Sequence, residues 1–579
     1  MWSLFNRKGP TISDITTRIV RYLQSEEYRP QRVRKLARAM GVAEEEYAVF
    51  RGAVKQLMRE GRVVQGGDNR VMLPTAARTI IGRFRGNQRG FGFVVPESPS
   101  DHGDLFIPPN ATLSAITGDT VAAKISKTKH RGGEKRIEGE IVEIIKRGHS
   151  RFVGELSKNA SQWLVIPDGH ALHAPVLVDD AGSTRAKTGD QVVVELTEYP
   201  TAHRPAYGVI VDVLGRRGDP GVDTISIIHQ YDFPTEFPEE VLENARQAIQ
   251  SHDLDAELEQ REDLRDEVVL TIDPDDAKDF DDAISIKMLG KGEVELGVHI
   301  ADVSAFVTPD SPLDNEARQR GNSIYLPQHV IPMLPEVLSN GLCSLQEDKP
   351  RLTKSAFITY DKNAKRIAKR YANTVIQSNQ RLTYRQATAI IDGTSKQNLP
   401  PEVINLVHEM NRLARAIQKR RLAGGMVVLD LPSIELVLDD NNEVTGVEPE
   451  DTSFSHTIIE MFMVEANEAV AELFASMNVP HIRRIHPDPP AEAQRKLGRF
   501  LRILGRSLPP KLERWDMINL LGSVRGKPES FMVNLAVLRS MSQAEYSPKE
   551  VGHFALASKH YSHFTSPIRR YPDLIIHRL

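Results

Sequence analysis

The segment from Asp273 to Asp282 places six aspartates and one lysine within ten residues. Apolar residues precede it, ending at Leu270, and apolar residues follow it from Ile284. Short apolar runs on either side of a polar turn are typical of buried strands, so we expect the turn to lie against a core. Two unit charges about 4 Å apart repel by ~4 kcal/mol at an effective dielectric constant of about 20. Any fold of this chain must therefore expose these carboxylates to solvent or neutralise them.

A divalent cation between the carboxylates is the interpretation that we favour, because uncompensated charge beside a core is costly. Hard oxygen ligands indicate Mg²⁺ or Mn²⁺. A calcium-binding EF-hand is excluded, since its loop requires glycine at the sixth position and glutamate at the twelfth, where this segment has Lys278 and Ile284. Metal ions held by carboxylates are typical of enzymes that cleave phosphodiesters. A solvated acidic turn is the simpler alternative.

The composition limits the class of protein. A chain of 579 residues is expected to form several domains. The formal net charge of -4 is close to neutral, so any nucleic-acid surface must be local. Cys343 is the one cysteine, which excludes an internal disulfide framework and argues against a cysteine-based zinc site. We find neither a signal peptide nor an apolar run that could span a membrane, and we expect a cytoplasmic protein.

The N-terminal region is predicted to be a winged helix. Three segments with helical spacing of apolar residues, from about Thr11, precede a pair of short strands, "RVVQ" and "RVML", that flank "GGDN". The second helical segment has a basic side with Arg32, Arg34, Lys35 and Arg38. This side is either a solvated helix face or a nucleic-acid surface.

Short strands with glycine breaks then run to about residue 215, which predicts two small β-barrels. In the first barrel, Phe91 and Phe93 alternate along one strand and Phe106 lies on a strand expected to pair nearby. We interpret them as a platform on which bases stack, with room left by the glycines beside Phe91. The alternative is that these rings are core. The second barrel offers a weaker platform, with Phe152 and Trp163.

The longer motifs resemble the ribonuclease II/ribonuclease R (RNB) family. They are the aspartates Asp273, Asp279, Asp281 and Asp282, the stretch Gly297 to Leu345, and "HFTSPIRRYPDLIIHRL". The resemblance implies a multidomain α+β fold with a winged helix, two cold-shock-like OB β-barrels and a mixed α/β RNB catalytic domain; this order resembles the ribonuclease R members. The predicted division is residues 1–75 for the winged helix, 79–145 and 147–216 for the barrels, 217–260 for a linker and acidic helix, and 261–579 for the catalytic domain, incomplete at its C-terminal end.

The resemblance also implies a function, which is processive 3′-to-5′ hydrolysis of RNA to nucleoside 5′-monophosphates in RNA turnover and quality control. It implies that the four aspartates bind Mg²⁺, with Mn²⁺ as a substitute, and that Asp281 is the one most closely tied to catalysis. Tyr325 matches the tyrosine that stacks on the terminal base, and Arg569 matches the arginine that steadies the scissile phosphate. The implied partner is single-stranded RNA with a free 3′ end, with structured or ribosome-associated RNA as further substrates, and the implied state is a monomer.

The sequence departs from the family in two respects, and two other classes of function stay open. Several members of the family clamp bases between the tyrosine and a phenylalanine in the region that is Gly424 to Pro432 here, where no aromatic residue occurs and Leu429 is the candidate replacement. The family continues beyond the position of Leu579 with a further OB domain, and we expect weaker RNA binding without it. His299 is expected to be a core histidine. The alternatives are a non-catalytic RNA-binding or RNA-chaperone protein with an inactive nuclease domain, and a DNA-binding regulator based on the winged helix.

Overall fold

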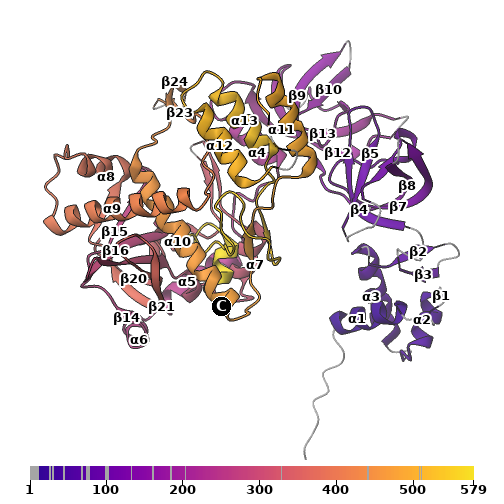
Figure 1. The fold of residues 1–579 in the computed structure, drawn as a ribbon. Coiled ribbons are helices and arrows are strands. Elements are labelled where there is room, and N and C mark those ends of the chain that lie inside the picture. The colour runs from indigo at the N-terminus through magenta and orange to yellow at the C-terminus, as the bar shows by residue number, and fades with distance from the viewer. Residues whose placement is uncertain are drawn as a thin grey trace, which may run out of the picture. The chain divides into compact units, whose positions relative to one another are not determined.

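The computed structural model divides into two compact units, Met1–Phe233 and Pro234–Leu579 (Figure 1). It describes residues 12–579 except 25–27, 29–30, 44–45, 61, 67–69, 74–78, 98–102, 132–133, 160–161, 183–184, 202–203, 328, 440–442, 508 and 510–511. The predicted start of the winged helix at Thr11 lies outside the described residues, as do Gly61, where the sequence predicts the end of the third helix, and most of the predicted turn. No helix in the described part of the chain is long and apolar enough to cross a membrane.

The winged helix predicted at the N-terminus is confirmed. Its helices are α1 (Ile12–Leu23), α2 (Val33–Ala39) and α3 (Tyr47–Arg59). A small antiparallel sheet has the order β1 (Gln31–Arg32), β3 (Arg70–Met72) and β2 (Val64–Gly66). The apolar faces of the helices meet in a core around Leu36, Phe50 and Leu57. The four basic residues of α2 and its N-cap lie exposed.

The two predicted barrels are also confirmed, each closed by five strands. In the first barrel these strands are β4 (Thr79–Gly86), β5 (Gly92–Pro96), β6 (Leu105–Ile107), β7 (Thr120–Arg131) and β8 (Glu134–Lys146). In the second they are β9 (Arg151–Asn159), β10 (Gln162–Pro167), β11 (Val176–Val178), β12 (Asp190–Glu198) and β13 (Ala206–Arg216). Alternating apolar residues fill each interior, as the period of two along a strand requires.

The segment predicted as a linker and acidic helix differs from that description in two respects. The linker contains a helix, α4 (Val222–Gln230), which lies against strands β9 and β13 of the second barrel. The acidic helix expected within residues 217–260 is divided into α5 (Glu239–Gln250) and α6 (Leu254–Leu258). Asp253 separates them, because its side chain accepts hydrogen bonds from the first amides of α6 and so starts a new helix.

A mixed seven-stranded sheet organises the described residues of the second unit. Its order is β14 (Glu262–Asp263), β21 (Arg366–Gln377), β20 (Pro350–Tyr360), β17 (Glu293–Ala301), β16 (Asp282–Gly290), β15 (Leu270–Asp273) and β22 (Gln380–Thr383). Strand β15 pairs parallel with β22 and antiparallel with β16. The aspartate-rich turn therefore joins two neighbouring strands, as the flanking apolar runs predicted.

Helices cover both faces of this sheet. On one face the core includes α8 (Tyr384–Ile391), α9 (Pro401–Ala423) and α10 (Phe454–Ser476), which pack on Leu296, Val298 and Ile300. On the other face it includes α5, α7 (Pro312–Arg320) and α14 (Tyr571–His577). A separate core joins α11 (Ala491–Ile503), α12 (Arg514–Val524) and α13 (Ser530–Ser540). Three short hairpins complete the unit: β18 (Ile324–Leu326) with β19 (His329–Ile331), β23 (Ile434–Leu438) with β24 (Val444–Pro449), and β25 (Arg483–Ile485) with β26 (Glu545–Ser547).

Candidate active site

The aspartate-rich turn begins at Asp273, the last residue of β15, and ends at Asp282, the first residue of β16. The hydroxyl group of Ser344 accepts a hydrogen bond from the Phe280 amide (3.1 Å) and donates one to the carbonyl of Lys278 (2.7 Å). Ser344 is fully buried. This single side chain therefore fixes the second half of the turn from a segment more than 60 residues away in the sequence.

Arg381 on β22 holds the first half of the turn. Its guanidinium donates to the carbonyls of Pro274 (2.5 Å) and Asp275 (3.1 Å). The Asp275 carboxylate points to the exposed Arg385, with which it forms an ion pair of 2.6 Å. Asp275 is thus a turn residue with its own counter-ion, and it is not among the residues that line the large cavity of this unit.

The other acidic side chains line that cavity, which has a volume of about 850 Å³. Asp273, Asp279, Asp281 and Asp282 all contribute to its wall. Burial raises the pKa of the Asp281 carboxyl to about 8, although Arg569 and the Ile568 amide oppose this shift. Burial also raises the pKa of Asp273 and of Asp282 well above the usual range, and each carboxyl is raised further by neighbouring carboxylates. Without a cation, these three carboxyls are therefore partly protonated at neutral pH.

The donor set fits a hard divalent cation. The Oδ2 atom of Asp273 is buried without a hydrogen-bond partner, and carboxylate oxygens are the ligands that Mg²⁺ and Mn²⁺ prefer. A cation would keep the carboxylates ionised despite their burial, because an opposite charge lowers their pKa. Within the described residues, no three acidic, histidine or cysteine side chains are close enough together to enclose an ion. The four predicted ligands therefore line one cavity, but no three of them converge on one point.

Arg569 and the backbone before it meet Asp281 directly. The amide of Ile568 donates to Oδ1 of Asp281 at 3.0 Å, and Nε of Arg569 lies 3.4 Å from Oδ2. The Arg569 side chain is 46% exposed and lines the cavity, and one of its terminal nitrogens donates to the hydroxyl of Ser566 at 3.3 Å. Nearby carboxylates raise the pKa of Arg569 against the opposing effect of its burial. The guanidinium therefore stays positive at every pH of interest.

Tyr325 lies on the β18–β19 hairpin at the same cavity. Its hydroxyl donates to Oδ2 of Asp279 at 3.1 Å, and half of the side chain is exposed. The amide of Ser323 donates to the carbonyl of Arg569 at 3.0 Å, and Asn322 forms a β-bridge with Arg570. The predicted stacking residue and the predicted phosphate-binding residue are thus carried by two segments that are hydrogen-bonded to each other.

Several residues of the cavity were not predicted from the sequence. They are Tyr384 at the start of α8, Glu460 and Asn467 on α10, and Tyr561, His563 and Arg570 on the C-terminal segment. Helical spacing could have grouped the α10 residues, since Ile459, Met463 and Asn467 recur every four residues. Leu429, the candidate replacement for a family phenylalanine, packs against the core of α11 to α13 and does not line the cavity. His299 is a buried core histidine, as expected, with Ser285 and Ser355 on its ring nitrogens.

In the first barrel, Phe91, Phe93 and Phe106 form a cluster with ring centroids 5.6 to 6.0 Å apart. All three rings are partly exposed and lie outside the core of the barrel, where Phe84 is buried instead. The structure therefore places the predicted platform on the surface. A groove of about 530 Å³ beside Phe91 is lined by Arg85 and Arg89, which would suit phosphate groups.

Two of the expectations for the barrels are wrong in detail. Gly92 does not make room for a ligand, because a Cβ atom there would lie 2.3 Å from the ring of Phe84 inside the barrel. This glycine makes room for a core side chain. Phe152 of the second barrel is 5% exposed and belongs to the barrel core, which leaves Trp163 as the partly exposed ring, with Lys158 4.8 Å from its centroid.

Known families and proteins match the chain along most of its length. The RNB domain matches residues 261–579, the ribonuclease B OB domain matches residues 82–144, and the cold shock domain matches residues 164–238. Ribonuclease R of Aquifex aeolicus is 34% identical over 561 residues, which is 96% of this chain and 78% of the relative.

Solved structures agree with these matches. Mycoplasma genitalium RNase R, in complex with ribose-methylated single-stranded RNA, has a TM-score of 0.77 at 27% identity and covers 86% of this chain and 78% of its own. Yeast Ssd1, a pseudonuclease, shares the fold at 18% identity with a TM-score of 0.63 over 87% of this chain and 69% of its own. Because the RNB match spans more than half of the chain and the bacterial relative aligns over nearly all of it, the chain belongs to the RNB family of exoribonucleases, in the ribonuclease R group.

Proposed function

We propose that this protein is a Mg²⁺-dependent, processive exoribonuclease that hydrolyses RNA from the 3′ end to nucleoside 5′-monophosphates. The observation that carries the proposal is the cavity in which four aspartates, Tyr325 and Arg569 are lined up together. The aspartates can hold a metal ion, the guanidinium can bind a phosphate and the exposed ring can stack on a base. Phosphodiester hydrolysis of a terminal nucleotide requires these groups in one cavity. The family membership of the chain and the RNA bound to its Mycoplasma relative support the same conclusion.

Asp273, Asp279, Asp281 and Asp282 would hold the metal, Mg²⁺ in preference to Mn²⁺. When bound, the metal supplies Lewis-acid activation of water and stabilisation of the leaving oxygen. Asp273 and Asp281 are buried from bulk water, which strengthens the interaction of their carboxylates with a cation. The Ile568 amide and Arg569 orient Asp281, so its carboxylate cannot rotate freely.

Arg569 and Tyr325 would bind the substrate. The positive guanidinium lies next to the acidic group, where it would bind the scissile phosphate and stabilise the charge that develops on it. The Tyr325 ring is exposed to the cavity and held at its hydroxyl by Asp279, so it can stack on a terminal base of any identity. Phe91, Phe93 and Phe106 would bind upstream bases of a single strand in the same sequence-independent way.

The proposal extends to the biological setting. We assign the domain division given by the sequence, a role in RNA turnover and quality control, a cytoplasmic location and a monomeric state. The preferred partner is single-stranded RNA with a free 3′ end, and structured or ribosome-associated RNA are further substrates.

The test is a degradation ladder on a 5′-labelled single-stranded RNA, with Mg²⁺ and with a chelator. Wild type is expected to convert full-length RNA to very short 5′ products without stable intermediates, and only when metal is present. Asp281→Asn is expected to lose at least about a thousandfold in rate, because it removes a charge that acts together with the metal. Asp275→Asn is the matched control, since this aspartate belongs to the same turn but faces Arg385, and it is expected to behave as wild type.

The outcomes separate the proposal from its alternative. Tight binding of RNA without cleavage, with Mg²⁺ or with Mn²⁺, would support the non-catalytic RNA-binding or chaperone function. Preferential binding or cleavage of DNA of the same sequence would contradict RNA as the substrate. Cleavage by Asp281→Asn at a rate close to that of wild type would contradict the assignment of the reaction to Asp281.

A further inference from the structure

Opposite faces of helix α10 carry different residues, and one of these faces lines the cavity of the candidate active site. Met463 and Asn467 face the cavity of the candidate active site. Glu465 stands two residues from each of them, which is about 200° around a helix, so it faces the opposite way. Glu468 and Glu472 follow it on that second side.

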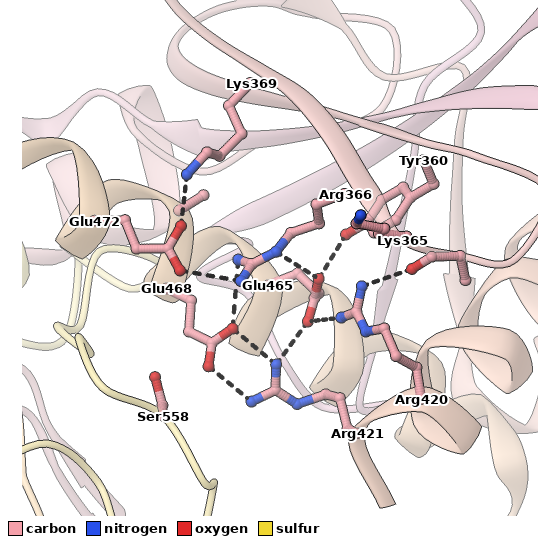
Figure 2. A network of polar contacts seen from close by, with 12 residues as sticks. Tyr360, Lys365, Arg366, Lys369, Arg420, Arg421, Glu465, Glu468, Glu472 and Ser558 are labelled. Carbon is pink, nitrogen blue, oxygen red and sulfur yellow. Dashed lines mark hydrogen bonds and ion pairs between the residues drawn. The ribbon is translucent and has the colours of Figure 1, made fainter. Parts of the chain in front are cut away.

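On the second side, α10 is fixed by buried ion pairs (Figure 2). Glu465 is fully buried, and its carboxylate accepts hydrogen bonds from Arg420, Arg421 and the hydroxyl of Tyr360. Glu468 binds both terminal nitrogens of Arg421, at 2.9 and 3.0 Å. Buried charged side chains with several hydrogen-bond partners are held in one geometry. These contacts therefore fix the rotation of α10 about its axis and its position along that axis.

On the cavity side, the Asn467 side chain connects α10 to the C-terminal segment by hydrogen bonds. Its side chain is 3% exposed. Its Oδ1 accepts a hydrogen bond from the amide of Phe564 at 2.7 Å, and its Nδ2 donates to the hydroxyl groups of Tyr561 (3.2 Å) and Thr565 (3.4 Å). All three partners lie a few residues before Ile568 and Arg569.

We propose that Asn467 is a positioning residue for the reaction. It holds segment 561–565 in place, so that the Ile568 amide and the Arg569 guanidinium meet Asp281. The side-chain hydrogen bonds of Asn467 go to this segment, so Asn467 acts through these groups. The inference rests on the proposed exonuclease function and adds a residue to the machinery that this function needs.

The decisive comparison is between Asn467 and a second buried asparagine. Asn534 on α13 is 2% exposed, and its Oδ1 accepts a hydrogen bond from the Asp430 amide at 2.8 Å. Asn534 does not line the cavity. The pair Asn467→Leu and Asn534→Leu therefore removes the same chemical group from two helices, of which one reaches the candidate active site.

The experiment measures the single-turnover rate of RNA cleavage with Mg²⁺, the RNA affinity and the melting temperature of each full-length variant. Asn467→Leu is expected to lower the rate by about 10- to 100-fold, as for a misplacement of about 1 Å in a catalytic group. Its RNA affinity is expected to change by less than about twofold, because the platform and Tyr325 are intact. Asn467→Asp keeps the acceptor for the Phe564 amide, so most of the rate is expected to return. Asn534→Leu is expected to lower the melting temperature without lowering the rate.

A rate for Asn467→Leu that equals the rate of Asn534→Leu at similar loss of stability would overturn the inference. Equal losses in Asn467→Asp and Asn467→Leu would also overturn it. If Asn467→Leu does not fold, Tyr561→Phe replaces it, because it deletes one partner of Asn467 and keeps the ring; an unchanged rate in that variant would count against the proposal. Wild type that cannot cleave RNA at all would instead contradict the proposed function, so the two failures are distinguishable.

Discussion

The buried carboxyl of Asp281 links the stability of the protein to pH and to metal. Its pKa is about 8 in the folded state and about 3.9 in an unfolded chain, so the folded state binds the proton more tightly. The stability that this proton contributes is complete below about pH 4 and is lost as the pH rises through about 8. With a chelator, we therefore expect the free energy of unfolding of wild type relative to Asp281→Asn to fall by roughly 1 kcal/mol per pH unit between pH 5 and 8.

Added Mg²⁺ should reverse this loss at pH 8 and have little effect at pH 5, where protons occupy the carboxyls. Urea unfolding at several pH values, with chelator and with Mg²⁺, measures both effects. The difference between wild type and Asp281→Asn matters because buried histidines such as His299 and His563, whose pKa values are lowered by burial, titrate in the opposite sense. A difference that does not depend on pH would contradict the assignment of a raised pKa to Asp281.

Tyr325 is expected to determine where degradation stops. Its ring faces the cavity, and stacking on a base contributes about 1 to 3 kcal/mol. Tyr325→Ala should therefore release its RNA earlier and leave longer end products, whereas the rate on long RNA should change less. Tyr325→Phe keeps the ring and loses only the contact with Asp279, so it should leave the same end products as wild type. A denaturing gel of the final products checks this, and identical product lengths in Tyr325→Ala would rule out the stacking role.

The first barrel separates the residues that bind from those that fold. Phe93 and Phe106 lie on the surface of β5 and β6, whereas Phe84 on β4 is 3% exposed in the core. Alanine at Phe93 or Phe106 should weaken RNA binding by about 5- to 100-fold and leave the melting temperature unchanged. Phe84→Ala should instead destabilise the barrel by about 3 to 5 kcal/mol. Fluorescence anisotropy and thermal melting of the same variants test both statements, and a stability loss in Phe93→Ala would indicate a core role.

The ion pairs behind α10 are predicted to contribute unequally to its stability. Glu465 is fully buried with three hydrogen-bonded partners, so Glu465→Gln removes the buried negative charge that Arg420 and Arg421 share and should cost about 3 to 5 kcal/mol. Glu472 binds Arg366 and Lys369 with its side chain 31% exposed, so Glu472→Gln should cost less than about 1 kcal/mol. Urea unfolding of each variant, followed through the transition of the second unit, measures the two losses of unfolding free energy. Equal losses would contradict the expectation that the loss depends on burial.

The architecture could be read from the sequence where the signals are local. The barrels follow from alternating apolar residues, and the position of the aspartate turn follows from its apolar flanks. The rest of the cavity could not be read in this way, because Tyr384, Glu460 and Asn467 reach the turn only when α8 and α10 pack on the sheet. The role of Gly92 also depends on tertiary packing, because the side chain that needs its space is Phe84 on the neighbouring strand.

The division into two units predicts that chemistry and part of the RNA binding can be separated. Every residue that lines the active-site cavity lies between Ile272 and Arg570, in the second unit. The platform of Phe91, Phe93 and Phe106 lies in the first. The fragment Pro234–Leu579 contains its own apolar cores, so it is expected to unfold cooperatively and to cleave RNA with Mg²⁺.

This fragment should bind RNA at least about tenfold more weakly than the full chain, because it lacks the three phenylalanine rings of the first barrel. Its cleavage rate at saturating RNA should stay within about threefold of the full chain's rate, which is a change of less than ~1 kcal/mol in the barrier. The fragment with Asp281→Asn is the control for contaminating nuclease. Calorimetry and single-turnover cleavage decide the matter. A fragment that folds but does not cleave saturating RNA would show that the first unit contributes to the chemistry itself, and the assignment of all catalytic groups to the second unit would then be wrong.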